Sequence, residues 1–257
     1  LEPWQIFIIC CVFGWVDQEG FRRFKTVYTE IPRKNAKSTL SSAVMLYLLA
    51  ADGEEGAEVY SAATTRDQAR IVWQDAHKMV QKTPGLRKHF GVETSAHSIH
   101  VPKTSSYCRA LSRDQGGNLD GLNIHAAVID ELHAHKTREV FDVIETGTGA
   151  RQQPLLWLIT TAGFNLAGIC YEQRSYVIRV LSGVQDDPEY FGIIFTIDEA
   201  DDWTDPAIWE KANPNWAVSV NPDDIARKAR KAQDVASAQN NFLTKHLNVW
   251  VNSEVAW

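Results

Sequence analysis

Two short segments of the sequence carry side chains that together could bind and hydrolyse a nucleoside triphosphate. The first is the loop of residues 31–39, in which Lys37 and Ser38 stand just ahead of an apolar, helix-forming stretch. A phosphate-binding loop needs such a lysine, a hydroxyl for Mg²⁺, and backbone N–H groups at a helix N-terminus. The usual pattern GxxxxGK[ST] is not fulfilled, because Ile31 and Ala36 stand at its two glycine positions.

The second segment, residues 125–131, is an apolar run that ends in Asp130 and Glu131. In a phosphate-transferring site, Asp130 would hold Mg²⁺ through water and Glu131 would act as general base on the attacking water. The two segments together predict a nucleoside triphosphatase. Thr160 and Thr161 follow the next predicted core strand, where their hydroxyls could sense the γ-phosphate or only bond to the local backbone.

The elements that would position these residues alternate between strands and helices along the chain. Short apolar or alternating runs predict strands, and apolar residues at helical spacing predict helices. This order is typical of an α/β fold with a mostly parallel central sheet flanked by helices. We expect strands at residues 23–30, 57–63, 98–101, 107–111, 126–129, 155–160 and 190–196, and helices at 40–50, 64–80, 138–146, 168–181 and 222–236.

Composition narrows the class of protein. The chain has 257 residues and a net charge of −6, which argues against a small basic domain that coats nucleic acid but allows a local basic patch. The apolar run at residues 6–12 is too short to span a membrane. The four cysteines, Cys10, Cys11, Cys108 and Cys170, form no CxxC pair, and we expect reduced, mostly buried thiols in a cytosol-like compartment.

Taken jointly, the motifs resemble the large terminase subunit of tailed bacteriophages, the ATP-driven motor that packages DNA into procapsids. Residues 32–39 are similar to that family's deviant Walker A loop, in which Arg33, four residues before Lys37, is characteristic. The strand ending at Asp130 and Glu131 is similar to its Walker B segment, and residues 160–162 to its coupling motif. Residues 1–5 resemble its adenine-recognition segment and residues 246–250 the exit from its ATPase region.

The resemblance implies a P-loop NTPase fold of the additional-strand, catalytic-glutamate type, followed by a small helical C-terminal subdomain. Residues 1–200 would form the ATPase core, and residues 201–257 a helical lid or linker. The family's nuclease domain would begin after about residue 257, so no nuclease activity is expected from this chain.

The resemblance also implies ATP and Mg²⁺ as cofactors and assigns roles to residues. Ser38 and Asp130 would hold Mg²⁺, Glu131 would activate water, and Arg33 would contact the γ-phosphate. Thr160 and Thr161 would couple hydrolysis to movement. The expected nucleotide-binding residues are Trp4 and Gln5 near the adenine, and Pro32, Arg33, Lys34, Asn35, Ala36, Lys37, Ser38 and Thr39 around the phosphates.

The expected partners are double-stranded DNA bound without sequence preference, the portal protein and the small terminase subunit. They imply a homo-oligomeric ring at the procapsid portal in the host cytoplasm, a monomer in isolation, and no membrane. Such rings often complete a site with an arginine from the neighbouring subunit. Arg151 is the first candidate and Arg113 the second, while a plain surface position or an internal salt bridge is the alternative for Arg151.

Other interpretations remain open at this point. The chain could be another P-loop motor such as a helicase, or a nucleotide-binding scaffold without turnover, because both loop glycines are replaced. The basic run at residues 227–231 fits a solvated helix face or a weak DNA contact. His133 and His135, like His97 and His100, are close enough in sequence to chelate a metal, but structural or solvated roles are the simpler interpretation.

Overall fold

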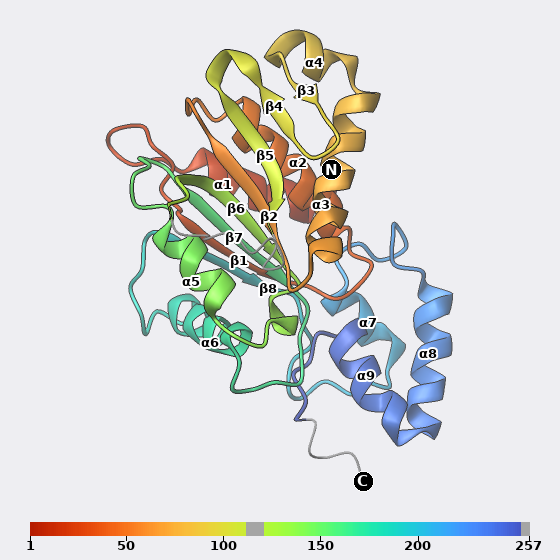
Figure 1. The fold of residues 1–257 in the computed structure, drawn as a ribbon. Coiled ribbons are helices and arrows are strands. Elements are labelled where there is room, and N and C mark those ends of the chain that lie inside the picture. The colour runs from red at the N-terminus through yellow and green to blue at the C-terminus, as the bar shows by residue number, and fades with distance from the viewer. Residues whose placement is uncertain (112–120, 253–257) are drawn as a thin grey trace.

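The computed structural model describes residues 1–111 and 121–252, which are built around one central sheet (Figure 1). The eight strands lie in the order β3-β4-β5-β2-β6-β7-β1-β8, and every pairing from β5 to β8 is parallel. Only the pairs β3–β4 and β4–β5, at one edge, are antiparallel. The strands are β1 (Thr26–Glu30), β2 (Glu58–Ala62), β3 (Glu93–Thr94), β4 (Ile99–Val101), β5 (Ser106–Leu111), β6 (Ile124–Asp130), β7 (Leu155–Thr160) and β8 (Tyr190–Ile194).

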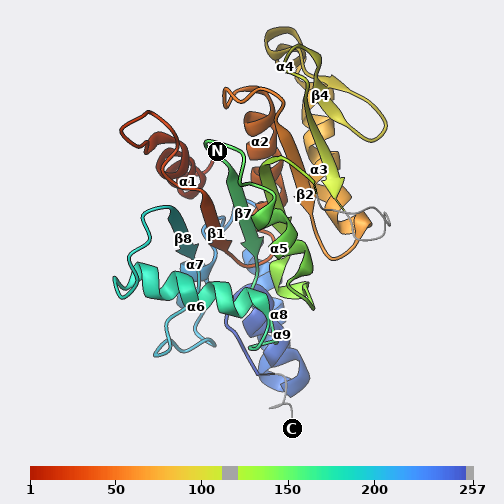
Figure 2. The ribbon, with the colours of Figure 1, turned by 60° about the vertical axis from the view of Figure 1, so that its left-hand side comes forward.

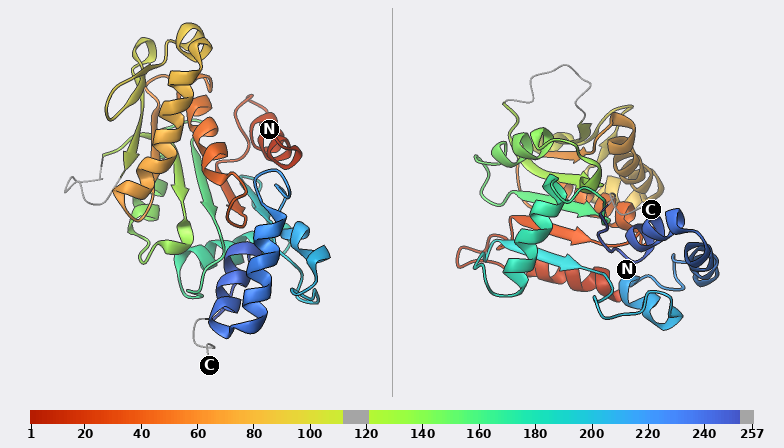
Figure 3. Two further views of the ribbon diagram at one scale, coloured as in Figure 1. Left: turned by 90° about the vertical axis from the view of Figure 1, so that its right-hand side faces the viewer. Right: turned by 90° about the horizontal axis from the view of Figure 1, so that it is seen from below.

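Helices cover both faces of this sheet (Figure 3). On one face lie α1 (Pro3–Gly14), α2 (Lys37–Ala50) and α3 (Arg66–Lys82), which share a core with Val27 and Trp157 of the strands. On the other lie α5 (Glu139–Thr146) and α6 (Ile169–Leu181), packed against Tyr28 and Leu158. Neighbouring strand residues point to opposite faces, so β7, which is covered on both sides, is apolar from Leu155 to Ile159. The short α4 (Pro84–Phe90) follows α3.

The C-terminal part of the chain is helical. It comprises α7 (Pro206–Ala212), α8 (Pro222–Asp234) and α9 (Ala236–His246), which bury Trp209, Ile225 and Phe242 in a core of their own. Asp205 and Asn221 cap α7 and α8 by accepting backbone N–H groups of the first turn. In Figure 2 the arrowhead of β7 points towards α8 and α9, so this helical part lies at the carboxyl ends of the central strands.

The α/β class and the helical C-terminal region are confirmed, and the division at residue 201 stays a prediction. The expected strands and helices are present with shifted ends: β6 is longer than expected, and α2 begins at Lys37 rather than at residue 40. α1, α4 and β3 were not predicted, and α7 and α9 were expected only in general terms, as part of a helical C-terminal region. α1 is apolar nearly all round, so its sequence lacks the periodicity that reveals an amphipathic helix.

The structure also bears on the expected lack of a membrane span and on the expected burial of the cysteines. Within the described ranges, no helix is both long enough and apolar enough to cross a bilayer. All four cysteines are free, but only Cys108 and Cys170 are buried. Cys10 is exposed and Cys11 is partly exposed, so the expectation of mostly buried thiols is wrong for the pair on α1. The reason is that α1 buries only one side against the sheet.

The strand order gathers the predicted chemistry at one edge. β7 lies between β1 and β6, and Glu30 is in register with Thr160 while Asp130 is in register with Ile159. Because parallel strands end at the same edge, the loop after β1, the threonines after β7 and the carboxylates of β6 are brought together. β7 is thus the additional strand that the resemblance implied.

The loop after β1 holds two non-glycine residues in left-handed backbone conformation. Lys34 has φ +71° and Ala36 has φ +56°. The alanine at the second glycine position of the phosphate-loop pattern therefore sits where a Cβ is costly.

Replacing that alanine tests the strain. We expect Ala36→Gly to raise the free energy of unfolding by about 0.5–1 kcal/mol, because relief of left-handed strain exceeds the added entropy of the unfolded chain. Ala43→Gly, on the exposed side of α2, is the matched control and should lower stability by about 1 kcal/mol. Chemical denaturation measures both, and a loss of stability in Ala36→Gly would contradict the assignment of strain.

Candidate active site

Lys37 is the buried centre of the site. It is the first residue of α2, and its Nζ donates to Oγ1 of Thr161 at 2.8 Å and to the carbonyl oxygens of Ile31 and Pro32 at 3.3 Å each. Burial lowers the pKa of Lys37, and the nearby charges of Glu131 and Asp130 oppose that shift. The ammonium is therefore held among oxygens at the N-terminus of a helix, where an anion would also be favoured.

Two carboxylates follow β6 at the same edge. Asp130 is 7% exposed, and its Oδ1 accepts the backbone N–H of Glu131 at 2.9 Å. Burial, reinforced by the charge of Glu131, raises the pKa of Asp130 to about 6. Glu131 has a left-handed backbone, φ +51°, which turns the chain sharply after the strand, and its Oε2 lies 3.1 Å from Nδ1 of His133.

The threonines after β7 link the two halves of the site. Oγ1 of Thr161 donates to the carbonyl of Ile31 at 3.1 Å while it accepts from Lys37. Oγ1 of Thr160 donates to the carbonyl of Thr161 and accepts the backbone N–H of His133, both at 3.0 Å. The end of β7 thus contacts the lysine on one side and the turn that carries Glu131 on the other.

The remaining loop residues connect to the C-terminal helices. Asn35 is fully buried: its Nδ2 donates to Oδ1 of Asn213 and its Oδ1 accepts the N–H of Asn215, both at 3.0 Å. The backbone N–H of Arg33 donates to the carbonyl of Lys245 at 3.0 Å. Among the side chains of the expected nucleotide-binding loop, Pro32 is buried, Ala36 and Ser38 are partly exposed, and Arg33, Lys34 and Thr39 are exposed.

The expected adenine-binding residues lie at the start of α1. The indole N–H of Trp4 donates to Oδ1 of Asn215, and its ring meets that of Phe195 edge-on at 5.6 Å. Oε1 of Gln5 accepts the backbone N–H of Glu2 at 3.0 Å and so caps the helix. Asn215 also contacts Asn35, so it links Trp4 to the loop. A contact between Trp4 and adenine stays a prediction.

Arg151 lies away from this cluster. Its Nη1 is 3.3 Å from Oε1 of Glu54, and the guanidinium donates to the carbonyls of Glu55, Gly56 and Asn123. It precedes β7, so it occupies the amino edge of the sheet, opposite the edge that carries Lys37. This placement favours the internal salt bridge over a contact to a neighbouring subunit's site. Arg113, the second candidate, lies outside the described residues.

Sequence reasoning missed several residues that touch the site. Lys245, at the end of α9, donates from Nζ to Nε2 of His133 at 3.1 Å and to the carbonyl of Ala162 at 3.3 Å. Asn248 accepts the N–H of Ala162 at 2.7 Å through Oδ1. Residues 246–250 resemble a family segment, but no local sequence pattern indicates that Lys245 and Asn248 contact the turn after β7.

The other constellations considered from sequence lie elsewhere. In the basic run on α8, Arg227 and Lys228 both pair with Asp224, Lys228 at 2.7 Å. This fits a solvated helix face, and a DNA contact there stays untested. Nε2 of His100 is 3.4 Å from the carboxylate of Glu93.

Asp130, at the carboxyl edge of the sheet, suits a divalent cation that is coordinated by both protein and nucleotide oxygens. Asp130 offers a hard carboxylate oxygen whose charged form is disfavoured by burial and by Glu131, a condition that a cation would relieve. In the ranges that the structure describes, no group of three His, Cys, Asp or Glu residues could hold a metal by itself. Mg²⁺ commonly takes one or two protein oxygens and completes its shell with phosphates and water, which fits Ser38 and Asp130.

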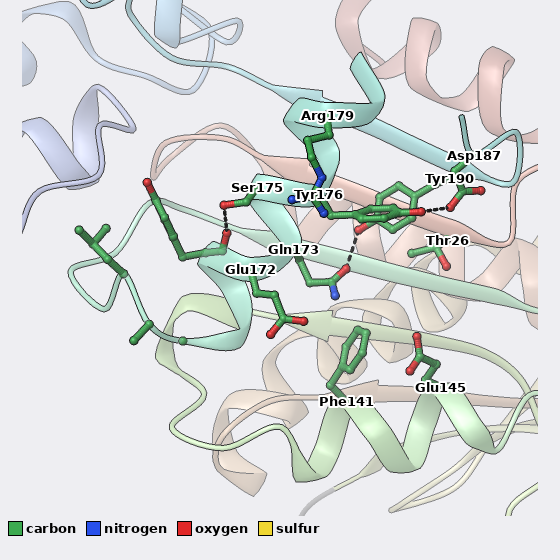
Figure 4. A pocket seen from close by; sticks show the side chains of 14 residues that line it. Thr26, Phe141, Glu145, Glu172, Gln173, Ser175, Tyr176, Arg179, Asp187 and Tyr190 are labelled. Carbon is green, nitrogen blue, oxygen red and sulfur yellow. Dashed lines mark hydrogen bonds between the residues drawn. The ribbon is translucent and has the colours of Figure 1, made fainter. Parts of the chain in front are cut away.

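A separate cavity of about 640 Å³ opens beside α6, and Figure 4 shows its lining. Tyr176 donates to Asp187 at 2.6 Å and Tyr190 to Gln173 at 2.9 Å, so these polar groups are satisfied within the wall. The lining includes more carboxylates than guanidinium groups, which disfavours a triphosphate. The expected nucleotide-binding residues take no part in it.

Comparison with known families decides the classification. The model of the terminase large subunit ATPase domain matches residues 3–179. This chain belongs to the terminase large subunit family. The model of the terminase endonuclease domain matches residues 184–257, earlier than the boundary expected from the sequence. In the structure this stretch supplies β8 to the central sheet and then forms α7–α9. The absence of nuclease activity stays a prediction.

One further relative and two solved terminase structures are similar to this chain. Protein YmfN of Escherichia coli (strain K12) is 44% identical over 167 residues, which cover 65% of this chain and 36% of YmfN. The crystal structure of the HK97 bacteriophage large terminase superposes with a TM-score of 0.84 at 26% identity, covering 97% of this chain and 50% of that one. The large terminase of a thermophilic bacteriophage, in complex with ATP-γ-S, shares the fold at a TM-score of 0.57 and 12% identity, covering 97% and 53%. The chain spans only about half, or less, of these proteins.

The raised pKa of Asp130 predicts that its charged carboxylate lowers the free energy of unfolding near neutral pH. The native pKa of about 6 lies above the usual value near 4, so the folded state binds the proton more tightly and stability falls as pH rises through this window. Asp130→Asn should therefore raise the free energy of unfolding above pH 6 by about 1–3 kcal/mol, with the gain fading towards pH 4. Denaturation between pH 4 and 8 measures this, with Asp234→Asn at an exposed position as control. A lower stability of Asp130→Asn than of the parent at pH 7.5 would contradict a destabilising charge at Asp130.

Proposed function

We propose that this chain is a Mg²⁺-dependent ATPase that drives translocation of double-stranded DNA into a viral procapsid. The observation that carries the proposal is the buried cluster at the carboxyl ends of β1, β7 and β6, where Lys37 contacts Thr161 and lies within electrostatic reach of Asp130 and Glu131. Membership of the terminase family supports the reaction, and the thermophilic-phage relative bound to ATP-γ-S supports the nucleotide.

Each group has a role that follows from its chemistry. Lys37 and the N–H groups at the start of α2 bind the β- and γ-phosphates, and Arg33 reaches the γ-phosphate from its exposed position. Ser38 and Asp130 would hold Mg²⁺, which would neutralise developing phosphate charge. Glu131 takes the proton from the attacking water.

Recognition and coupling complete the proposal. Trp4 and Gln5 would border the adenine at the start of α1. Thr160 and Thr161 touch both the lysine side and the glutamate side of the site, which suits a relay of γ-phosphate loss.

The assembly proposed for the chain follows from its family. It would act as a homo-oligomeric ring with the portal protein and the small terminase subunit, on DNA bound without sequence preference, at the procapsid in the host cytoplasm, and would be a monomer in isolation. We propose that this chain itself does not cleave DNA. Arg113 remains the candidate for an arginine supplied to a neighbouring site.

A change at the base tests the enzyme assignment. Glu131→Gln keeps the shape of the side chain but removes the base, so phosphate release should fall by about 10²–10⁴-fold while ATP-γ-S still binds. Turnover at the parent rate would show that Glu131 is not the base. Absence of turnover in the parent chain, with binding intact, would instead favour a nucleotide-binding scaffold.

A change at the lysine tests the binding site. Lys37→Ala should weaken ATP-γ-S binding at least tenfold, because it removes the charge that meets the β- and γ-phosphates. Lys78→Ala, an exposed lysine on α3 paired with Asp75, is the control and should bind as the parent does. Equal affinity in all three proteins, measured by titration calorimetry, would place the nucleotide elsewhere.

A further inference from the structure

His133 stands between two charged groups of the site. On one side its Nδ1 lies 3.1 Å from Oε2 of Glu131, and on the other its Nε2 lies 3.1 Å from Nζ of Lys245. The backbone N–H of His133 is fixed by Thr160. The imidazole therefore forms a bridge from the end of α9 to the glutamate after β6.

The chemistry of Lys245 determines which nitrogen of the imidazole carries the proton. A lysine ammonium has only donors, so Nε2 must accept, and the ring proton then resides on Nδ1. From Nδ1 it faces Oε2 of Glu131 and Oγ1 of Thr160, which is 3.1 Å away. In the structure the hydrogen bond of Nδ1 goes to Oγ1 of Thr160, and the nearby Oε2 of Glu131 is buried without a hydrogen-bond partner. Burial lowers the pKa of His133 to about 4, with Lys245 adding to the effect, so the ring is neutral near pH 7.

The bridge is firmly supported. Nζ of Lys245 also donates to the carbonyl of Ala162, and the carbonyl of Lys245 accepts the N–H of Arg33. A Cβ added at Gly163 would lie 3.1 Å from Cβ of His133 and 3.2 Å from the ring of Trp250, so a side chain in the turn after β7 would crowd the histidine.

We propose that His133, oriented by Lys245, is a positioning residue for Glu131: a small rotation moves its Nδ1–H from Thr160 onto the unpartnered Oε2, which fixes that carboxylate oxygen so that the other can meet the attacking water. The proposal rests on the proposed ATPase function. It makes α9 part of the catalytic machinery, because any movement that withdraws Lys245 releases the histidine and with it the orientation of the base.

Kinetics separate positioning from a general structural role. His133→Ala should lower kcat by about 10- to 100-fold, the size expected from a misplaced catalytic group, with ATP-γ-S affinity within about threefold of the parent. His133→Asn should recover most of the loss, because an asparagine amide can donate from nearly the same place as Nδ1. His97→Ala, an exposed histidine far from the site, is the control.

An unchanged kcat in His133→Ala would overturn the proposal, and so would an Asn variant no better than the Ala variant. Lys245→Met should lower kcat in the same direction without weakening ATP-γ-S binding. If the parent chain itself hydrolyses no ATP, the proposed function fails, and the tautomer of His133 then tests by itself whether Lys245 orients the ring.

Long-range ¹H–¹⁵N correlation spectra of the imidazole rings read that tautomer without any turnover. At pH 7 His133 should be the neutral Nδ1–H form in the parent chain, and Lys245→Met should shift it towards the Nε2–H form. Lys211→Met, which alters an exposed lysine paired with Asp198 and Asp201, should leave the signal unchanged. An Nε2–H tautomer in the parent chain would contradict the proposal.

Discussion

The buried ammonium of Lys37 is the interaction on which the rest of the site depends. A charge taken out of water is costly unless oxygens surround it, and here Thr161 and two carbonyls at the end of β1 supply them. The arrangement is possible because β7 lies between β1 and β6, which puts Thr161 beside the lysine and Asp130 within range of its charge. Asp130 is a buried acid near this lysine. Burial raises the pKa of its carboxyl to about 6, so the charged form is costly near neutral pH.

The C-terminal helices belong physically to this site. Asn35 of the loop is held by Asn213 and Asn215, and Lys245 reaches over the turn after β7. Farther back, the buried carboxylate of Glu30 accepts from Arg174, Asn248 and Trp250. The region after β8 therefore braces both the phosphate loop and the strand behind it. A motor that must convert hydrolysis into movement needs contacts of this kind between its site and a separate packing unit.

The sequence predicted those parts of the fold and site that depend on local patterns. Apolar strands, the Lys37–Ser38 pair and the carboxylates after β6 are visible locally, and parallel-sheet geometry predicts that they meet. Arg151 could have been placed by the same rule, since a residue that precedes a parallel strand lies at the far edge from one that follows it. Lys245 and Asn213 could not be found, because their roles arise only from packing between segments distant along the chain. The uniformly apolar α1 gave no helical period to detect.

The most direct test of the central claim is hydrogen–deuterium exchange with and without Mg²⁺ and ATP-γ-S. The account predicts slower exchange in residues 31–39 and 130–133, in the turn at 160–163, and in the segment around Asn213 and Asn215, because one ligand would order all four through the contacts described. The lining of the cavity beside α6, at residues 171–179, should exchange as before. Protection confined to that cavity, with no change at residues 31–39, would contradict the claim that the nucleotide binds at the carboxyl edge of β1, β7 and β6.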